Sequence, residues 1–523
     1  MECAVQFENI TKTFGQVVAN RDVTMSVMHG EVLSLLGENG SGKTTLMNML
    51  AGIYYQDSGR ILLDGVPVEI RSPKDAIAHG IGMVHQHFKL VDVFTAAENI
   101  ALGLDNKERF DMKLIKERAR QICERYHFDL NLNQKVYSMS VSQKQTLEIV
   151  KVLFHGAEIL ILDEPTAVLT PQETEKLFNV IRNMQEDGKA IIIITHKLSE
   201  VLAVSNRVAI LRKGEYVGTV LTKEASVELL TEMMVGETIS LNIARPEPKN
   251  LVERLSVRNL SVVNAEGVQV LKDLNFDVFG GEILGIAGVS GNGQKELLES
   301  IAGLQKTSQR SSIQFFAPYC SEALELIGRT PKAIRKAGVH LSFVPEDRLG
   351  MGLVGSMGMT DNMMLKSYEN GMPLILDRQK PRMLAERIMR ELQVVTPGVS
   401  TPVSRLSGGN VQKVLVGREI AESPVVLMTA YAVRGLDINT SYTIYNLLNE
   451  QKAKGVAVIY VGEDLDVLLE LCDRILVLCG GEITAILDGK STSKEEVGRY
   501  MTMTDNSDGD EAENETAGGT YNE

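Results

Sequence analysis

The chain has 523 residues, of which 44% are hydrophobic and 23% charged, and its 54 Lys and Arg against 68 Asp and Glu give a net charge of −14. This balance is typical of a globular protein with several domains and excludes a globally disordered chain, and the acidic excess argues against a protein that coats nucleic acid. No apolar run approaches the ~18 residues that span a bilayer, no secretory signal is visible, and the five scattered cysteines fit reduced thiols in a cytosolic protein.

Short apolar segments alternate with segments of helical period along the first half of the chain. This alternation predicts an α/β fold built around a largely parallel sheet. The polar, helix-periodic stretch 105–126 predicts a separate helical lobe. Strands are expected at residues 32–36, 159–162 and 190–194, and helices at 43–50, 143–154 and 171–185.

A glycine-rich loop lies between the first of these strands and the first helix. It reads Gly37-Glu38-Asn39-Gly40-Ser41-Gly42-Lys43-Thr44 and matches the pattern G-x-x-x-x-G-K-[ST]. The backbone N–H groups of such a loop face phosphate oxygens, and the helix N-terminus adds positive potential. Lys43 is therefore predicted to reach the β- and γ-phosphates of a nucleotide, and Thr44 to ligate Mg²⁺.

Two carboxylates follow the apolar strand at residues 159–162. Asp163 suits the coordination shell of Mg²⁺, and Glu164 suits the polarisation of a water for in-line attack on a phosphate. Two acidic residues before a turn are common and do not by themselves indicate a nucleotide site. The phosphate loop in the same domain is what favours a role for this pair in nucleotide hydrolysis.

Three further candidates are weak when taken singly. Gln86 lies between His85 and His87, which lack metal-ligand partners at useful spacing and are interpreted as structural. His196 follows an apolar strand, where a lone histidine is more often structural. Phe14 precedes the phosphate loop at a position suited to stacking on a base, although an aromatic residue there usually belongs to the core.

The second half of the chain repeats the first, which indicates two homologous domains. The turn and strand at residues 30–37 recur at 281–288. Three later pairs of segments share one offset of 267 residues (437 − 170): these are 139–143 with 406–410, 167–170 with 434–437, and 194–198 with 461–465.

The predicted domains are residues 1–236 and 254–503. A short linker, residues 237–253, joins them and contains two prolines. The last segment, 504–523, is rich in Asp and Glu and has neither Lys nor Arg, so it is expected to be a solvated, disordered tail.

The second half lacks the side chains that would act on phosphate. A neutral amide at Gln294 cannot supply the charge of a lysine, although the next residue, Lys295, leaves partial compensation open. The substitutions relative to the first half are Gln294 for Lys43, Lys295 for Thr44, Glu346 for Gln86, Ala430 and Tyr431 for Asp163 and Glu164, and Glu463 for His196, with no aromatic residue in place of Phe14.

The order of these motifs resembles the ABC ATPase family over essentially the whole chain, twice. In this resemblance Gln86 corresponds to the Q-loop, residues 139–143 to the signature, Asp163 and Glu164 to the Walker B motif, and His196 to the switch histidine. The resemblance implies an α/β fold of two tandem P-loop ABC nucleotide-binding domains, each a RecA-like α/β core with a helical subdomain.

The resemblance also implies that each ATP lies between the phosphate loop of one domain and the signature of the other. The first domain's loop pairs with the second domain's complete signature, whereas the other pairing has Ser142 for a signature glycine and Thr170 for the D-loop aspartate. One hydrolytic site per chain is therefore expected. Its expected residues are Lys43, Gln86, Glu164 and His196 for catalysis; Thr44, Gln86 and Asp163 for Mg²⁺; and Phe14, Gly37, Asn39, Gly40, Ser41, Gly42, Lys43, Thr44, Thr45, Ser407, Gly408, Gly409 and Asp437 for ATP.

Several short sequence segments resemble those of the fused ATP-binding subunits of bacterial nucleoside importers. Simple-sugar importers share the tandem plan, but their second phosphate loop usually has a basic residue where Gln294 stands, which favours nucleosides. The segments that carry this resemblance are 80–88, 94–100, 233–236, 291–294 and 344–348.

By this resemblance the chain is an ATPase on the cytoplasmic face of the membrane, attached peripherally. Its expected partners are two membrane permease subunits and, indirectly, an extracytoplasmic substrate-binding protein, without nucleic acid. The helical lobes, residues 89–137 and about 351–403, would dock the permeases, and the methionines at 351–364 belong either to that contact or to the core. The transported solute is not encoded in this subunit.

Two other classes of protein are alternatives to an importer subunit. A soluble tandem ABC protein of translation or DNA repair should have two competent sites and often a long basic segment between its domains. A scaffold without activity should lack the complete first site. The chain departs from both expectations.

Overall fold

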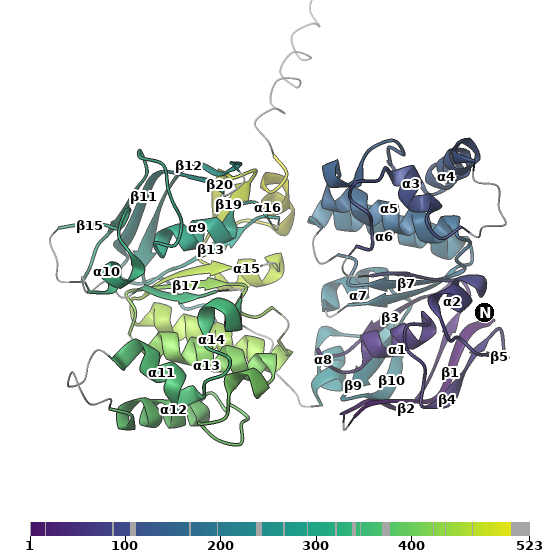
Figure 1. The fold of residues 1–523 in the computed structure, drawn as a ribbon, viewed down its shortest axis with the longest axis horizontal. Coiled ribbons are helices and arrows are strands. Elements are labelled where there is room, and N and C mark those ends of the chain that lie inside the picture. Colours follow the sequence, from purple (N-terminus) through teal and green to yellow (C-terminus); the bar gives the residue numbers. More distant parts are fainter. Residues whose placement is uncertain are drawn as a thin grey trace, which may run out of the picture. The chain divides into compact units, whose positions relative to one another are not determined.

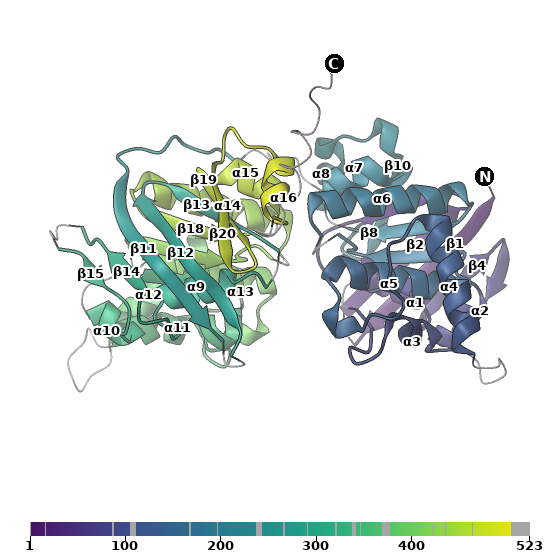
Figure 2. The same cartoon turned by 90° about the horizontal axis from the view of Figure 1, so that it is seen from above.

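The computed structural model divides into two compact units, one from Met1 to Leu241 and one from Asn242 to Glu523 (Figure 1, Figure 2). The residues that the structure describes are 2–15, 17–85, 88–104, 111–166, 169–195, 197–236, 243–264, 267–289, 291–318, 322–336, 341–345, 347–368, 377–421, 423–434, 436–462 and 464–503.

The first unit contains a six-stranded sheet with the order β10-β9-β3-β8-β7-β6. All neighbours are parallel except β10, which runs antiparallel to β9 at one edge. The largely parallel sheet predicted from the sequence is therefore confirmed. The strands are β3 (Val32–Leu36), β6 (Ile81–Val84), β7 (Ile159–Asp163), β8 (Ala190–Ile194), β9 (Arg207–Arg212) and β10 (Glu215–Leu221).

A second, antiparallel sheet of the first unit was not predicted from the sequence. Its order is β2-β1-β4-β5, and its two longest strands span 12 residues each. Polar and apolar residues are mixed along them because one face is solvated, so they lack the continuous apolar run of a buried strand. The strands are β1 (Cys3–Phe14), β2 (Val17–Met28), β4 (Ser58–Leu63) and β5 (Val66–Val68).

Alternate residues of the parallel strands enter two different cores. In β8, Ile192 and Ile194 pack with α1 and the antiparallel sheet, whereas Ile191 and Ile193 pack with α5 and α6 on the other face. Both faces are buried, so the strand is apolar throughout. The helices are α1 (Lys43–Leu50), α2 (Pro73–Ala78), α3 (Ala96–Ala101), α4 (Met112–Tyr126), α5 (Val141–Phe154), α6 (Pro171–Glu186), α7 (Leu198–Val204) and α8 (Val227–Val235), with 3₁₀ turns at Val136–Ser138 and Thr222–Glu224.

The expected helical lobe is formed by α3, α4 and the side of α5 that faces them. Its small core includes Ile100, Ala119 and Leu147, one from each helix. Hydroxyl N-caps fix where the helices begin: Ser140 caps α5 and Thr170 caps α6, each with a capping box. Residues 105–110 of the predicted lobe lie outside the described residues.

The second unit repeats this architecture. Its six-stranded sheet has the order β16-β17-β18-β13-β19-β20 and its antiparallel sheet the order β12-β11-β14-β15. The strands are β11 (Val252–Val263), β12 (Gln269–Gly280), β13 (Ile283–Ala287), β14 (Ser312–Phe315), β15 (Leu324–Glu325), β16 (Leu341–Val344), β17 (Val426–Ala430), β18 (Ala457–Val461), β19 (Arg474–Cys479) and β20 (Glu482–Asp488). The helices are α9 (Gln294–Ile301), α10 (Pro331–Lys336), α11 (Met359–Ser367), α12 (Gln379–Glu391), α13 (Gly408–Ala421), α14 (Ile438–Ala453), α15 (Leu465–Leu471) and α16 (Lys494–Tyr500), with a π-helix at Arg348–Gly352 and a 3₁₀ turn at Val403–Arg405.

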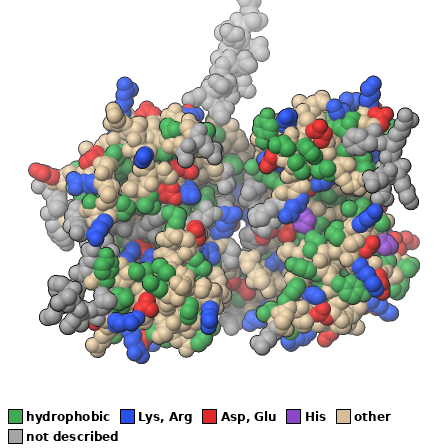
Figure 3. Space-filling model, viewed as in Figure 1, with side chains coloured by type: hydrophobic (Ala, Val, Ile, Leu, Met, Phe, Trp, Pro, Cys, Tyr) green, Lys and Arg blue, Asp and Glu red, His purple; other side chains and the backbone are tan. Residues whose placement is uncertain are grey.

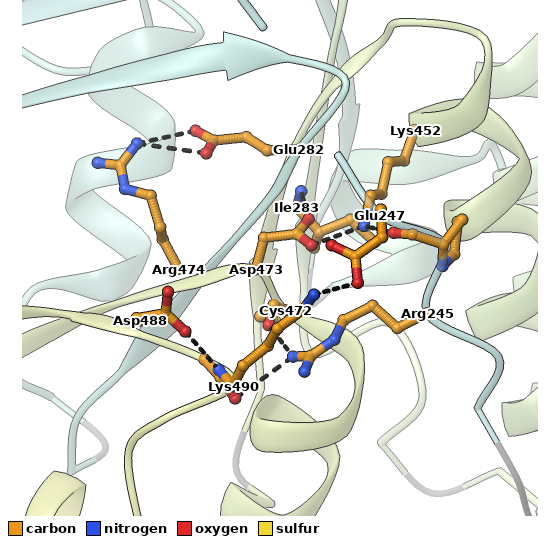
Figure 4. A network of polar contacts seen from close by, with 12 residues as sticks. Arg245, Glu247, Glu282, Ile283, Lys452, Cys472, Asp473, Arg474, Asp488 and Lys490 are labelled. Atoms are coloured by element: carbon orange, nitrogen blue, oxygen red, sulfur yellow. Dashed lines mark hydrogen bonds and ion pairs between the residues drawn. The ribbon is translucent and has the colours of Figure 1, made fainter. Parts of the chain in front are cut away.

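A buried glutamate explains the Gly-Glu turn that the sequence repeats. Glu31 accepts a hydrogen bond from the backbone N–H of Met28 at 2.7 Å and pairs with Arg207 at 3.2 Å. Glu282 makes the matching pair with Arg474 at 3.0 Å (Figure 4). Each glutamate thereby fixes the turn that leads into the central strand before the phosphate loop.

The end of the predicted linker packs against the second unit. Ile243 is buried in that unit's core. Arg245 donates to the carbonyl oxygens of Leu469 and Cys472, and Lys490 pairs with Glu247 (Figure 4). Residues 237–242 and the predicted tail, 504–523, lie outside the described residues, so these two boundaries stay predictions.

On the face drawn in Figure 3, each unit carries charges of both signs. Figure 3 shows Lys and Arg interspersed with Asp, Glu and hydrophobic side chains on one face of both units. Within the described part of the chain, every helix is too short or too polar to cross a membrane.

Candidate functional site

The phosphate loop of the first unit connects β3 to α1. Gly42 is the N-cap of α1 and has φ 95° and ψ 1°, in the left-handed region that favours glycine. A Cβ there would lie 2.3 Å from the carbonyl oxygen of Ala19, so a side chain has no room. Of the other predicted loop residues, Gly37 and Ser41 are buried, Thr45 is half-buried, and Asn39, Gly40 and Thr44 are exposed.

Lys43 is the centre of the site. Its side chain turns back into the loop, where Nζ donates to the carbonyl oxygens of Gly37 at 2.6 Å and Glu38 at 2.9 Å. Burial lowers the pKa of Lys43 to about 8, against the opposing charges of Glu164 and Asp163. The structure thus brings together the lysine and the two carboxylates that the sequence predicted as one site.

The two carboxylates stand at the carboxyl end of β7. Burial, followed by the charge of Glu164, raises the pKa of Asp163 to about 6. Glu164 is half-buried and has φ 47°, a left-handed conformation that is unusual for a residue other than glycine. Such local strain is concentrated at functional sites because the surrounding fold must hold it in place. Here the N–H of Glu164 donates to the carbonyl oxygen of Ile194 at 2.8 Å.

The chemistry of this site fits a phosphate-bound Mg²⁺ and not a metal held by protein alone. Among the described residues, no three His, Cys, Asp or Glu side chains form a group that could hold a metal ion. Asp163 supplies one carboxylate, and Thr44 presents an exposed hydroxyl in the first turn of α1. Mg²⁺ commonly binds through one or two carboxylates together with substrate phosphates.

Phe14 lies at the end of β1 with 45% of its surface exposed. It is therefore not a core residue. Its ring packs edge-on against Tyr54, with 5.2 Å between ring centroids. Tyr54 was not singled out from the sequence, because it follows α1 and reaches Phe14 only through the fold. Together the two rings offer an exposed aromatic surface suited to a base.

Two predicted catalytic residues, Gln86 and His196, lie outside the described residues, as does His87. His85 is half-buried, and burial followed by the charges of Lys89 and Lys151 lowers its pKa. This favours the neutral form of the ring, and the structural role expected for His85 stays a prediction.

The second unit keeps the backbone of the phosphate loop without its charge. Gly293 has φ 103° and ψ 5°, close to the values at Gly42. Gln294 is 2% exposed and donates from Nε2 to the carbonyl oxygen of Val289 at 3.0 Å. The amide thus takes the place of Lys43. The Lys295 side chain is 60% exposed and lies 3.9 Å from Glu299, outside the loop.

The Walker B position shows the same pattern. Tyr431 has φ 50°, and its N–H donates to the carbonyl oxygen of Val461 at 2.9 Å, as Glu164 does in the first unit. The backbone is retained although Ala430 and Tyr431 supply no carboxylate. A cavity of about 290 Å³ opens there, lined by Lys295, Leu298, Glu299, Pro345, Asp347, Met351, Ala430 and Tyr431.

The predicted signature and D-loop residues of the second unit lie together. Ser407 and Gly408 are exposed at the start of α13. A Cβ on Gly409 would lie 3.5 Å from Oδ2 of Asp437. The Asp437 carboxylate is also the N-cap of α14, where it accepts from the N–H of Thr440 at 2.7 Å. In the first unit Thr170 caps α6 in the same way, so this position has a structural role in both units.

The loop, the buried lysine and the paired carboxylates define the first unit as a P-loop nucleotide-binding domain. Two stretches of the chain, residues 20–167 and 271–429, match the family model described as ABC transporter. They cover more than half of the chain, which therefore belongs to the ABC transporter family, with two such domains in tandem. The resemblance drawn from the motifs is confirmed.

Curated relatives extend over nearly the whole chain. It is 38% identical to the glucose import ATP-binding protein TsgD13 of Haloferax volcanii, over 95% of both chains. It is also 38% identical to the guanosine import ATP-binding protein NupO of Bacillus subtilis, over 96% of this chain and 98% of the relative. The ribose import ATP-binding protein RbsA of Hahella chejuensis is 35% identical, over 96% and 99%.

Proposed function

We propose that the chain is the ATP-hydrolysing, energy-coupling subunit of a bacterial ABC importer for nucleosides. One observation carries this proposal: the first unit holds Lys43, Asp163 and Glu164 in one site, while the second unit keeps the same backbone without these side chains. Relatives named for nucleoside and guanosine import, both 38% identical, support the choice of solute.

The proposed mechanism uses one competent ATP site. Phe14 and Tyr54 receive the base, and the loop N–H groups together with Lys43 hold the phosphates. Asp163 and Thr44 would hold Mg²⁺, which neutralises charge on the β- and γ-phosphates when bound. Glu164 orients and polarises the attacking water.

We propose that the second unit completes this site with Ser407, Gly408, Gly409 and Asp437, as the ABC resemblance implies. Gln86 and His196 are proposed to sense the γ-phosphate from the first unit. The signature of the second unit is complete and its first residues are exposed at a helix N-terminus, where an anion is favoured.

The proposed partners are two membrane permeases, an extracytoplasmic binding protein that delivers solute, and no nucleic acid. Peripheral attachment at the cytoplasmic face follows from those partners. Exposed apolar side chains in the first helical lobe, including Val93, Phe94 and Tyr137, support a docking role. Of the methionines considered for the second lobe, Met351 and Met357 are exposed.

The second candidate is a simple-sugar importer, favoured by the relatives named for glucose and ribose import. Uptake of labelled guanosine and labelled ribose by cells carrying Glu164→Gln in place of the normal chain separates the two. We expect guanosine uptake to be lost and ribose uptake to be unchanged. Loss of ribose uptake alone would move the protein to the sugar group, and no change in either would contradict both assignments.

A further inference from the structure

A buried amide contacts the phosphate loop of the first unit from outside the loop. Asn20 lies on β2 with no exposed surface, and its Nδ2 donates to the carbonyl oxygen of Gly42 at 3.2 Å. The same carbonyl accepts the first bond of α1, from the N–H of Leu46 at 2.9 Å. Asn20 therefore adds a second donor to the carbonyl that immediately precedes Lys43.

The position of this carbonyl decides where the next N–H points. In a trans peptide the C=O and N–H groups point in opposite directions. A Gly42 carbonyl held toward β2 therefore directs the Lys43 N–H to the other side, where the loop's N–H groups face phosphate. Glycine rotates easily, so an extra hydrogen bond at this peptide restrains the loop in its binding conformation.

The other atom of the Asn20 amide is unpartnered. Oδ1 is buried and accepts no hydrogen bond from any residue that the structure describes. An unsatisfied buried polar atom lowers stability, and such an atom calls for an explanation beyond packing. A leucine of similar size would avoid this cost, so stability alone does not account for the amide.

The second unit has a leucine at the position that corresponds to Asn20. Leu271 occupies the matching position on β12: the residue after it donates its N–H to Gly481, as Arg21 does to Gly214 in the first unit. A Cβ on Gly293 would meet the Leu271 side chain at 2.4 Å, as one on Gly42 would meet Asn20 at 2.6 Å. Since the two loops have nearly the same backbone, a leucine is compatible with the fold here.

The second unit ties its loop with a different amide. Asn292, at the position of Ser41, donates to the carbonyl oxygen of Leu478 and accepts from the N–H of Gly480, both at 3.3 Å. Neither contact touches the peptide before Gln294. Among the residues that the structure describes, the amide directed at that peptide is thus found in the unit that has the lysine and not in the other.

We propose that Asn20 is a positioning residue that raises the affinity of the first unit for the nucleotide triphosphate, acting through the Gly42–Lys43 peptide. This rests on the proposed ATP site.

The test is the variant Asn20→Leu of the full chain, which introduces the residue found at the matching position of the second unit. Equilibrium binding of labelled ATP and steady-state ATP hydrolysis are measured with the thermal unfolding midpoint. We expect Kd and KM for ATP to rise about five- to tenfold, as for the loss of about one hydrogen bond. We expect kcat within about twofold, because Lys43 and Glu164 are untouched. We expect a thermal midpoint that does not fall, because a leucine at this position removes the unsatisfied buried oxygen and is compatible with the fold of the second unit. Kd and KM within twofold of the unsubstituted chain would overturn the proposal, and so would a lower kcat at unchanged KM.

Two variants sharpen the result. Asn20→Asp keeps the shape but removes the donor, so ATP affinity should fall at least as far as in Asn20→Leu; wild-type affinity would contradict the role of Nδ2. Leu271→Asn makes the reverse exchange in the second unit and should leave KM unchanged.

Lys43→Ala separates this proposal from the one it rests on. If Lys43→Ala abolishes ATP binding and Asn20→Leu does not weaken it, the ATP site stands and the role of Asn20 is refuted. If the unsubstituted chain binds no ATP, both proposals are refuted.

Discussion

At the scale of single residues, the two units differ in side chains and agree in backbone. Glu164 and Tyr431 share a left-handed conformation with φ 47° and 50°. Lys43 and Gln294 both donate to backbone carbonyls of their own loops. The second unit therefore forms the same loop without the charges that we propose act on phosphate.

This difference predicts opposite effects of matched substitutions on ATP hydrolysis. Lys43→Ala should abolish turnover by removing the charge on the phosphates. Glu164→Gln should reduce it by about 10²–10⁴, the range for loss of a general base. Gln294→Ala and Lys295→Ala should retain most turnover, because Gln294 carries no charge and the Lys295 side chain lies outside its loop.

Steady-state ATP hydrolysis by the assembled transporter measures all four variants. A large loss in Gln294→Ala would contradict the asymmetric model. A large loss in Lys295→Ala alone would show that this lysine compensates for the missing one.

At the scale of elements, one contact between a helix and a strand edge is neutral in one unit and charged in the other. In the first unit Gln185 of α6 donates to Oδ1 of Asn206 at 2.9 Å, and Asn206 accepts from the N–H of Val32. In the second unit Lys452 of α14 pairs with Asp473 at 2.7 Å, with both side chains buried, and Asp473 accepts from the N–H of Ile283 (Figure 4). Lys452 also donates to the carbonyl oxygen of Pro246.

The first unit therefore supplies a neutral replacement for the charged pair. Lys452→Gln or Asp473→Asn alone should destabilise the second unit by about 3–5 kcal/mol, because each leaves one buried charge without its partner. The double variant copies the first unit and should lie within about 1 kcal/mol of the unsubstituted chain. Hydrogen exchange of backbone amides in β13 and β19 under increasing urea reports on this unit specifically. Additive losses in the double variant would show that the two charges do not stabilise each other.

At the scale of the whole molecule, each unit has its own cores and its own pair of sheets. Among the described residues, three core clusters belong to the first unit and two to the second. Each unit thus has its own core, whereas the lysine and carboxylates that we propose for hydrolysis belong to the first unit. This division favours an energy-coupling subunit over a protein with two equal ATPase domains.

An energy-coupling subunit should follow its permeases through fractionation. We expect the chain to sediment with membranes and to be released by detergent together with two membrane proteins. Ribosome pelleting in high and low salt is the control, because a tandem ABC protein of translation would follow ribosomes. Recovery of the chain with ribosomes, and not with membranes, would contradict the importer assignment.

The parallel sheet, the phosphate loop, the acid pair and the absence of both motifs from the second half could all be predicted from the amino-acid sequence. These features are local: a continuous apolar strand such as residues 190–194, or a glycine pattern before a helix, is readable within a few residues. The repeat then placed the matching residues of the second half by offset alone.

The contacts between distant segments could not be predicted and depend on the three-dimensional fold. The antiparallel sheets pair long strands of mixed polarity, which carry no continuous apolar signal. Asn20 meets Gly42, and Phe14 meets Tyr54, because strand pairing brings segments far apart in sequence together. The same fold buries Gln294 and leaves Lys295 exposed, since neighbouring positions on a helix face different sides. Local pattern therefore identified the chemistry of the site, and long-range packing determined which side chains hold it in place.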